Sequence, residues 1–232
     1  MKIEQIYTGC LAQGAYYIIS NGEAAIIDPL RETEPYLRMA EADKAEIKYI
    51  FLTHFHADFV SGQYDLAQKT GATIVFGPNA KAEYEIYNGK DGEEFKIGDI
   101  KLRLMHTPGH TMESSSYVLI DKNGKMPYVF TGDCLFIGDV GRPDLAVKSD
   151  MTEKDLAGHL FDSLRNKIMG VDSILPSLNP SQREGLLKAS PSGRGLVRAN
   201  YVFSPIFWTV VPFSRSNSGH RFTASTAAQP AA

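Results

Sequence analysis

The chain has 232 residues, of which 43% are hydrophobic, enough for one substantial domain with a core of its own. Its formal net charge of −3 gives no reason to expect nucleic-acid binding, and no stretch is apolar enough to cross a membrane. The N-terminus lacks the apolar core of a signal peptide, which indicates a cytoplasmic protein.

Strand-like and helix-like runs alternate over most of the chain. Short apolar runs rich in β-branched and aromatic residues predict strands, and longer amphipathic stretches predict helices. The expected strands are 2–8, 15–20, 24–28, 48–53, 73–76, 100–106, 115–120 and 127–131, and the expected helices are 32–43, 60–70 and 152–161. Strands alternating with helices favour an α/β or mixed layered fold.

Potential metal ligands follow three of the expected strands. They lie in Thr-His-Phe-His-Ala-Asp at 53–58, in Thr-Pro-Gly-His-Thr at 107–111 and in Thr-Gly-Asp at 131–133. Imidazole and carboxylate groups donate lone pairs to a borderline divalent ion such as zinc or ferrous iron. Because strand ends are held by a rigid scaffold, this pattern predicts a preorganised metal site.

These three motifs, in this order and spacing, resemble those of the metallo-β-lactamase superfamily. Within it, the segments 57–62 and 135–144 are most similar to persulfide dioxygenases, particularly bacterial ones in which this domain precedes rhodanese domains. The resemblance covers about residues 1–169. It implies an αββα sandwich, with two mixed sheets packed face to face, helices outside and the metal at one sheet edge.

The resemblance implies that His54, His110 and Asp133 bind one iron ion. Two histidines and one carboxylate leave adjacent open positions, so ferrous iron can hold a persulfide and dioxygen side by side. The implied substrate is a low-molecular-weight persulfide, typically glutathione persulfide or that of a related bacterial thiol. The implied product is sulfite, and a rhodanese partner could deliver the persulfide.

Arg142 matches the family's Gly-Arg motif near the substrate, and the resemblance implies a substrate-binding role. Its planar cationic fork suits a carboxylate or an anionic sulfur group. The alternative is a structural ion pair with Asp139 or Asp144, because charged neighbours often merely pair.

His56 and Asp58 are expected to act in catalysis beside the metal. In hydrolases of the superfamily both usually bind metal, and the residue after the aspartate is a histidine of a second metal site. Here that residue is Phe59, which cannot coordinate a metal. A mononuclear, oxygen-using site is therefore favoured, in which His56 and Asp58 orient ligands or bound water by hydrogen bonds.

Two other functions stay open. The first is a zinc-dependent, glyoxalase II-like thioester hydrolase, because a zinc-bound hydroxide needs only one metal and the same residues could hold it. The second is a truncated, inactive domain that binds metal weakly, because the C-terminal part of the chain has a different character.

That C-terminal part is poor in acids and rich in serine, proline and arginine. From residue 171 onward there are two acids, Asp172 and Glu184, and Pro205 and Pro212 interrupt its apolar run. No further strand, Gly-His-Gly-type loop or closing helix is recognisable there. We therefore expect a metallo-β-lactamase-like domain at 1–169, a poorly ordered tail at 170–232, and a sandwich that is incomplete at its C-terminus.

Overall fold

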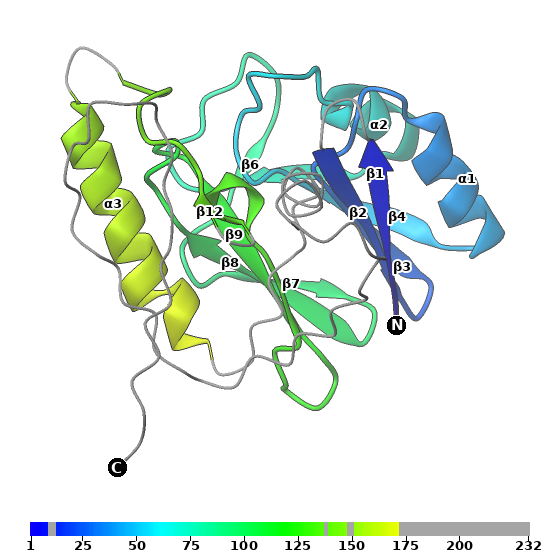
Figure 1. The fold of residues 1–232 in the computed structure, drawn as a ribbon. Helices are drawn as coiled ribbons and strands as arrows, with labels where there is room; N and C mark the ends of the chain where they lie inside the picture. Colours follow the sequence, from blue (N-terminus) through cyan, green and yellow to red (C-terminus); the bar gives the residue numbers. More distant parts are fainter. Residues whose placement is uncertain (9–12, 137–138, 148–150, 172–232) are drawn as a thin grey trace, which may run out of the picture.

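The computed structural model describes residues 1–8, 13–136, 139–147 and 151–171. Two β-sheets pack face to face, with helices α1 and α2 outside one sheet and α3 outside the other (Figure 1). The αββα arrangement expected from the sequence is therefore confirmed. The expected tail and the expected incomplete end of the sandwich lie outside the described residues, apart from residues 170 and 171.

The first sheet has six strands in the order β1-β2-β3-β4-β5-β6 and is mixed. Strands β1 to β3 are antiparallel neighbours, whereas β3 to β6 run parallel. Helix α1 returns the chain to the same edge between β3 and β4, and helix α2 does so between β4 and β5. The strands are Lys2–Thr8, Gln13–Ser20, Glu23–Ile27, Glu46–Phe51, Thr73–Phe76 and Tyr87–Asn88, and the helices are Glu34–Ala42 and Gln63–Thr70.

The second sheet has the order β10-β9-β8-β7, and its described strands are antiparallel throughout. A two-stranded hairpin, β11 with β12, and helix α3 follow it along the chain. The strands β7 to β12 are Glu94–Ile97, Ile100–His106, Ser115–Ile120, Tyr128–Phe130, Leu135–Phe136 and Asp139–Val140; α3 is Glu153–Asn166, and the short 3-10 helices η1 and η2 are Gly132–Cys134 and Ile168–Gly170.

The main core lies between the two sheets. Phe51 of β4 meets Phe95 of the opposite sheet at a ring distance of 5.3 Å and Tyr117 at 4.8 Å. The other face of the first sheet packs against α1 and α2, through side chains such as Ile26 and Leu66. Because both faces are covered, the central strands need apolar side chains at successive positions, which explains their uninterrupted hydrophobic runs.

Helix α3 begins at a capping box and holds a loop of the site in place. Thr152 Oγ1 accepts a hydrogen bond from the Asp155 amide, and the Asp155 carboxylate accepts one from the Thr152 amide. Further along the helix, Ser163 Oγ donates to the Pro108 carbonyl at 2.8 Å. A Cβ on Gly109 would lie 2.4 Å from the backbone of α3, so only glycine lets this loop approach so closely.

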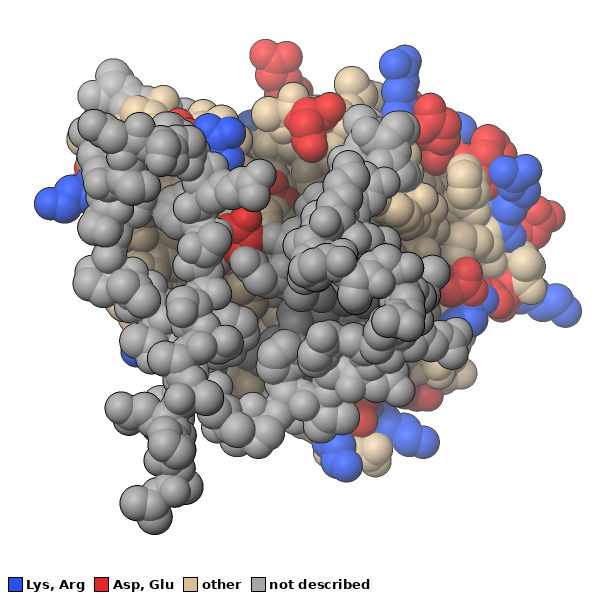
Figure 2. Space-filling model, viewed as in Figure 1, with Lys and Arg blue, Asp and Glu red and all other residues tan. Residues whose placement is uncertain are grey.

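None of the helices in the described part of the chain combines the length and apolar character that a bilayer crossing requires. On the face drawn in Figure 2, acidic and basic side chains of described residues are intermingled along the side where α1 and α2 lie. The drawn lysines and arginines therefore do not gather into one continuous basic patch on this side.

Candidate metal centre

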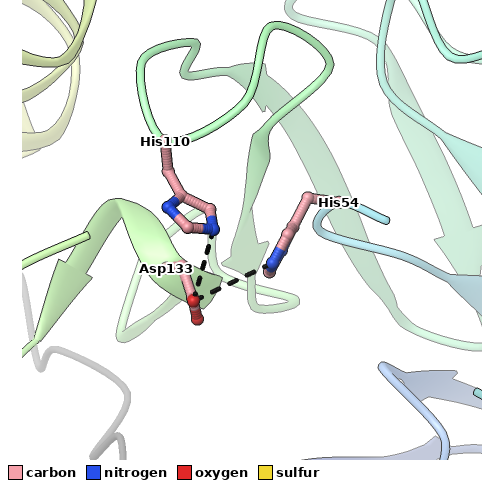
Figure 3. A group of neighbouring side chains, drawn as sticks. All are labelled: His54, His110 and Asp133. Carbon is pink, nitrogen blue, oxygen red and sulfur yellow. Dashed lines mark ion pairs between the residues drawn. The ribbon is translucent and has the colours of Figure 1, made fainter. Parts of the chain in front are cut away.

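Three loops at one edge of the sandwich bring His54, His110 and Asp133 together. His54 follows β4, His110 lies between β8 and β9, and Asp133 lies in η1 directly after β10. One potential ligand atom from each residue lies within 4.8 Å of the other two. His110 Nε2 is 3.5 Å and His54 Nε2 is 3.9 Å from Asp133 Oδ2, and the three side chains point toward one another (Figure 3). The structure therefore assembles the three residues that the motifs indicated.

The two histidines and the aspartate differ in their exposure to solvent. His54 and His110 are buried, whereas the Asp133 side chain keeps 35% of its surface exposed. His110 Nδ1 lies 2.9 Å from the Arg142 carbonyl, which can only accept, so Nδ1 carries the proton and Nε2 keeps its lone pair. The group thus offers a metal at least one oriented imidazole nitrogen, beside a carboxylate that is partly exposed.

The electrostatics of this group suit a divalent cation. Burial holds the pKa of the His54 imidazole well below its ordinary value, and the nearby His56 and His110 lower it further. Burial also raises the pKa of the Asp133 carboxyl. A cation among these atoms would stabilise the Asp133 carboxylate and so oppose the effect of burial there, and it needs the neutral imidazole that burial already favours at His54. The donor atoms and their environment therefore fit a metal ion.

His56 lies beside the group without belonging to it. Its ring centroid is 4.1 Å from that of His54 and 4.4 Å from that of Phe59. His56 Nε2 is 3.2 Å from Asp28 Oδ1, close enough for attraction but not aligned as a hydrogen bond. Burial opposes the charged imidazole, but the carboxylates of Asp28, Asp133 and Asp58 together outweigh it and raise the pKa of His56. Asp58 is exposed and is not brought into the three-residue group.

Asp28 is a site residue that the motif analysis missed. It follows β3 directly, is 4% exposed and has a positive φ of 48°. Its carboxylate accepts hydrogen bonds from the Thr53 amide and the Thr53 hydroxyl, each at 2.8 Å. The signal that could have found it is a carboxylate directly after a buried apolar strand, the same pattern that marked Asp133.

Arg142 contributes to the site through its backbone, whereas its side chain is engaged elsewhere. Its guanidinium binds Asp144 through two contacts, Nη2 to Oδ2 at 2.5 Å and Nε to Oδ1 at 3.1 Å. The ion pair that the sequence left as an alternative is therefore formed with Asp144. The Arg142 side chain is 57% exposed, so the guanidinium stays accessible to a solute.

The fold and this site agree with the comparison with known families. The profile of the metallo-beta-lactamase superfamily matches residues 8–190, and the chain belongs to this superfamily. The match runs past residue 169, where the motif resemblance ended, into residues that the structure does not describe beyond 171. A metal-binding site of histidine and aspartate residues is consistent with that membership.

Three similar proteins are described by three different names. A solved metallo-beta-lactamase from Staphylococcus aureus is 34% identical, with a TM-score of 0.68 over 77% of this chain and 56% of that one. ETHE1 from Myxococcus xanthus is 28% identical, with a TM-score of 0.64 over 76% of this chain and 75% of that one. The cytoplasmic hydroxyacylglutathione hydrolase of Arabidopsis thaliana is 34% identical over 147 residues, 61% of this chain. The match spans only 56% of that hydrolase, little more than half its length.

Proposed function

We propose that this chain is an iron-dependent persulfide dioxygenase, which oxidises a low-molecular-weight persulfide of the glutathione type to sulfite. The observation that carries the proposal is the convergence of His54, His110 and Asp133 into one group of two imidazoles and one carboxylate. Such a set favours ferrous iron with open positions beside it. The likeness to Myxococcus xanthus ETHE1 supports the persulfide dioxygenase type that the motifs resemble.

The surroundings of this group favour one metal ion over two. Within the described residues, His54, His110 and Asp133 form the one cluster with metal-ligand spacing. Phe59, which cannot coordinate a metal, stacks near His56, and His56 Nε2 faces Asp28. This arrangement supports the mononuclear, oxygen-using reaction over a binuclear hydrolase.

A bound ferrous iron would supply the one-electron and oxygen chemistry that protein side chains lack. In the overall reaction, a persulfide, a dioxygen and a water give a thiol, a sulfite ion and two protons, so the outer sulfur is oxidised as dioxygen is reduced. The protein residues bind and orient the reactants. We assign His56, held opposite Asp28, to orienting the group around His54, and the exposed Asp58 to accepting a hydrogen bond from substrate or water.

Arg142→Ala is expected to raise the KM for glutathione persulfide about tenfold with little change in kcat, because it removes a charged hydrogen-bond donor that holds the substrate equally well before and during the reaction. Steady-state oxygen uptake measures both constants. Asp144→Asn is the matched control, since it weakens the ion pair but leaves the guanidinium free for substrate. An equal rise in KM in both variants would show that the ion pair, rather than substrate binding, is the role of Arg142.

A second candidate is a zinc-dependent thioester hydrolase of the glyoxalase II type. It is favoured by the 34% identity over 147 residues to the Arabidopsis hydroxyacylglutathione hydrolase. The same three residues could hold a zinc ion, which lowers the pKa of a bound water to about 7. A third possibility, an inactive metal-binding domain, predicts that neither reaction occurs.

The two activities are separated by assaying one preparation with both substrates. The full chain, purified after iron-replete expression, is given glutathione persulfide in an oxygen electrode and, separately, the thioester S-lactoylglutathione. We expect oxygen uptake matched by sulfite formation and negligible thioester cleavage. Thioester cleavage without oxygen uptake would contradict the dioxygenase proposal and favour the hydrolase. In a separate assay, adding a rhodanese and a sulfur donor in place of the persulfide tests whether such a partner delivers the substrate.

A further inference from the structure

We propose that Asp28, acting through Thr53, is a positioning residue that holds His54 with its proton on Nδ1 and leaves Nε2 free to bind metal. The inference deepens the proposed function, and it rests on that proposal only in taking His54 as a metal ligand. Neither Asp28 nor Thr53 belongs to the group of three that would touch the metal.

The hydrogen-bond pattern at Thr53 has a single consistent direction. Asp28 Oδ2 lies 2.8 Å from Thr53 Oγ1, and a carboxylate offers only acceptors, so the hydroxyl hydrogen points to Asp28. Thr53 Oγ1 is also 3.0 Å from His54 Nδ1. A hydroxyl has one hydrogen, which is already used, so Thr53 Oγ1 must accept in the second contact. His54 Nδ1 is then the donor, and Nε2 is left with its lone pair.

The three residues linked by these contacts are buried. Asp28, Thr53 and His54 are all at most 4% exposed, so water cannot readily replace either hydrogen bond. Asp28 Oδ1 also accepts a hydrogen bond from the Thr53 amide, so the carboxylate is held by two hydrogen bonds, one on each oxygen. Asp28 keeps a positive φ, an uncommon backbone conformation for an aspartate, and the carboxylate is held there by these bonds.

The hydroxyl of Thr53 is also fixed from the side of Asp133. A Cβ added to Gly132 would lie 2.4 Å from Thr53 Oγ1, so the Thr53 side chain packs directly against the residue that precedes Asp133. The Thr53 side chain therefore contacts both loops that carry the His54 and Asp133 ligands.

The proton position on His54 decides its usefulness as a ligand. A neutral imidazole has one donor and one acceptor nitrogen, and only the acceptor can bind a metal. His54 Nε2 is the atom that faces Asp133 Oδ2, at 3.9 Å. With the proton on Nε2 instead, an N–H would occupy the direction in which the metal must be bound. Loss of such an orienting partner typically lowers metal affinity about 10- to 100-fold.

The test is to read the proton position directly in the metal-free full chain. Long-range ¹⁵N–¹H NMR of uniformly ¹⁵N-labelled protein distinguishes a protonated from an unprotonated ring nitrogen. We expect His54 to be protonated at Nδ1 in the wild type, to lose this preference in Thr53→Val and to regain it in Thr53→Ser. His110 is the internal control, because its Nδ1 donates to the Arg142 carbonyl and should not change in any variant.

Metal affinity provides the second readout, measured with Zn²⁺ as the probe in competition with a chromogenic chelator. Thr53→Val should bind Zn²⁺ about 10- to 100-fold more weakly than wild type, and Thr53→Ser should stay within about threefold. Asp28→Asn, which removes the carboxylate but keeps its shape, should weaken binding as Thr53→Val does.

A wild-type His54 protonated at Nε2 would overturn the inference, even if every variant failed to fold. An unchanged Zn²⁺ affinity in folded Thr53→Val would overturn it as well. A wild-type protein with the expected proton position but no persulfide-dependent oxygen uptake would instead count against the proposed function. The two proposals therefore fail by different measurements.

Discussion

Asp133→Ala is expected to abolish stoichiometric metal binding and to lower persulfide-dependent oxygen uptake by about a thousandfold or more. The substitution removes the one carboxylate of the group and leaves two buried imidazoles, which alone are an incomplete set for iron. Metal assistance contributes several kcal/mol, and each 1.4 kcal/mol is about tenfold in rate. Metal analysis of the purified variant and an oxygen electrode provide the measurement.

The stability of the metal-free variant separates loss of a ligand from misfolding. Burial raises the pKa of Asp133, so the folded chain binds this proton more tightly than the unfolded chain does. Its contribution to stability is then greatest below the unfolded pKa and is lost as pH rises through the folded pKa. At neutral pH, Asp133→Ala should therefore leave the metal-free thermal midpoint unchanged or higher. The control is Asp162→Ala, at an exposed position of α3, which should keep metal and activity. Full metal content in Asp133→Ala would contradict the assignment of Asp133 as a metal ligand.

Gly141→Ala is expected to disrupt the site by steric overlap. A Cβ at this buried position would lie 1.8 Å from the Asp133 carbonyl oxygen and 3.1 Å from His110 Cβ, so the backbone near two ligands must move. We expect destabilisation of about 3 kcal/mol and loss of stoichiometric metal, measured by denaturant unfolding and metal analysis.

Gly158→Ala is the matched control for this substitution. Gly158 lies within α3, and a Cβ there meets nothing within 4 Å. Alanine favours the helix, so the variant should be about 0.5 to 1 kcal/mol more stable and should retain its metal. If Gly141→Ala bound metal as tightly as Gly158→Ala, the close packing around His110 and Asp133 would not matter for the site.

Sequence patterns identified the strands that are buried on both faces and missed short strands that lack a continuous apolar run. The strand expected at 48–53 is observed as β4, because its apolar residues are needed on both sides of the sheet. The two residues of β6 and the four of β7 were not expected. In β7 only Phe95 and Ile97 are buried, and so short an alternation carries little signal.

Site residues that lie in short sequence motifs could be predicted, whereas contacts between residues far apart in the sequence could not. His54, His110 and Asp133 each lie in a short motif at a strand end, and the structure brings the three together. Asp28 lies 25 positions from Thr53 in the sequence, and their contact arises only because β3 and β4 are parallel neighbours. For the same reason, the sequence left the ion-pair partner of Arg142 open.

The central claim is a mononuclear iron site that oxidises a persulfide, and metal analysis paired with oxygen uptake tests it most directly. The full chain is purified after iron-replete expression, its iron and zinc are quantified, and the same sample is given glutathione persulfide. The account predicts about one iron per chain and oxygen uptake that depends on the persulfide. Stoichiometric zinc without oxygen uptake, or no retained metal at all, would contradict it.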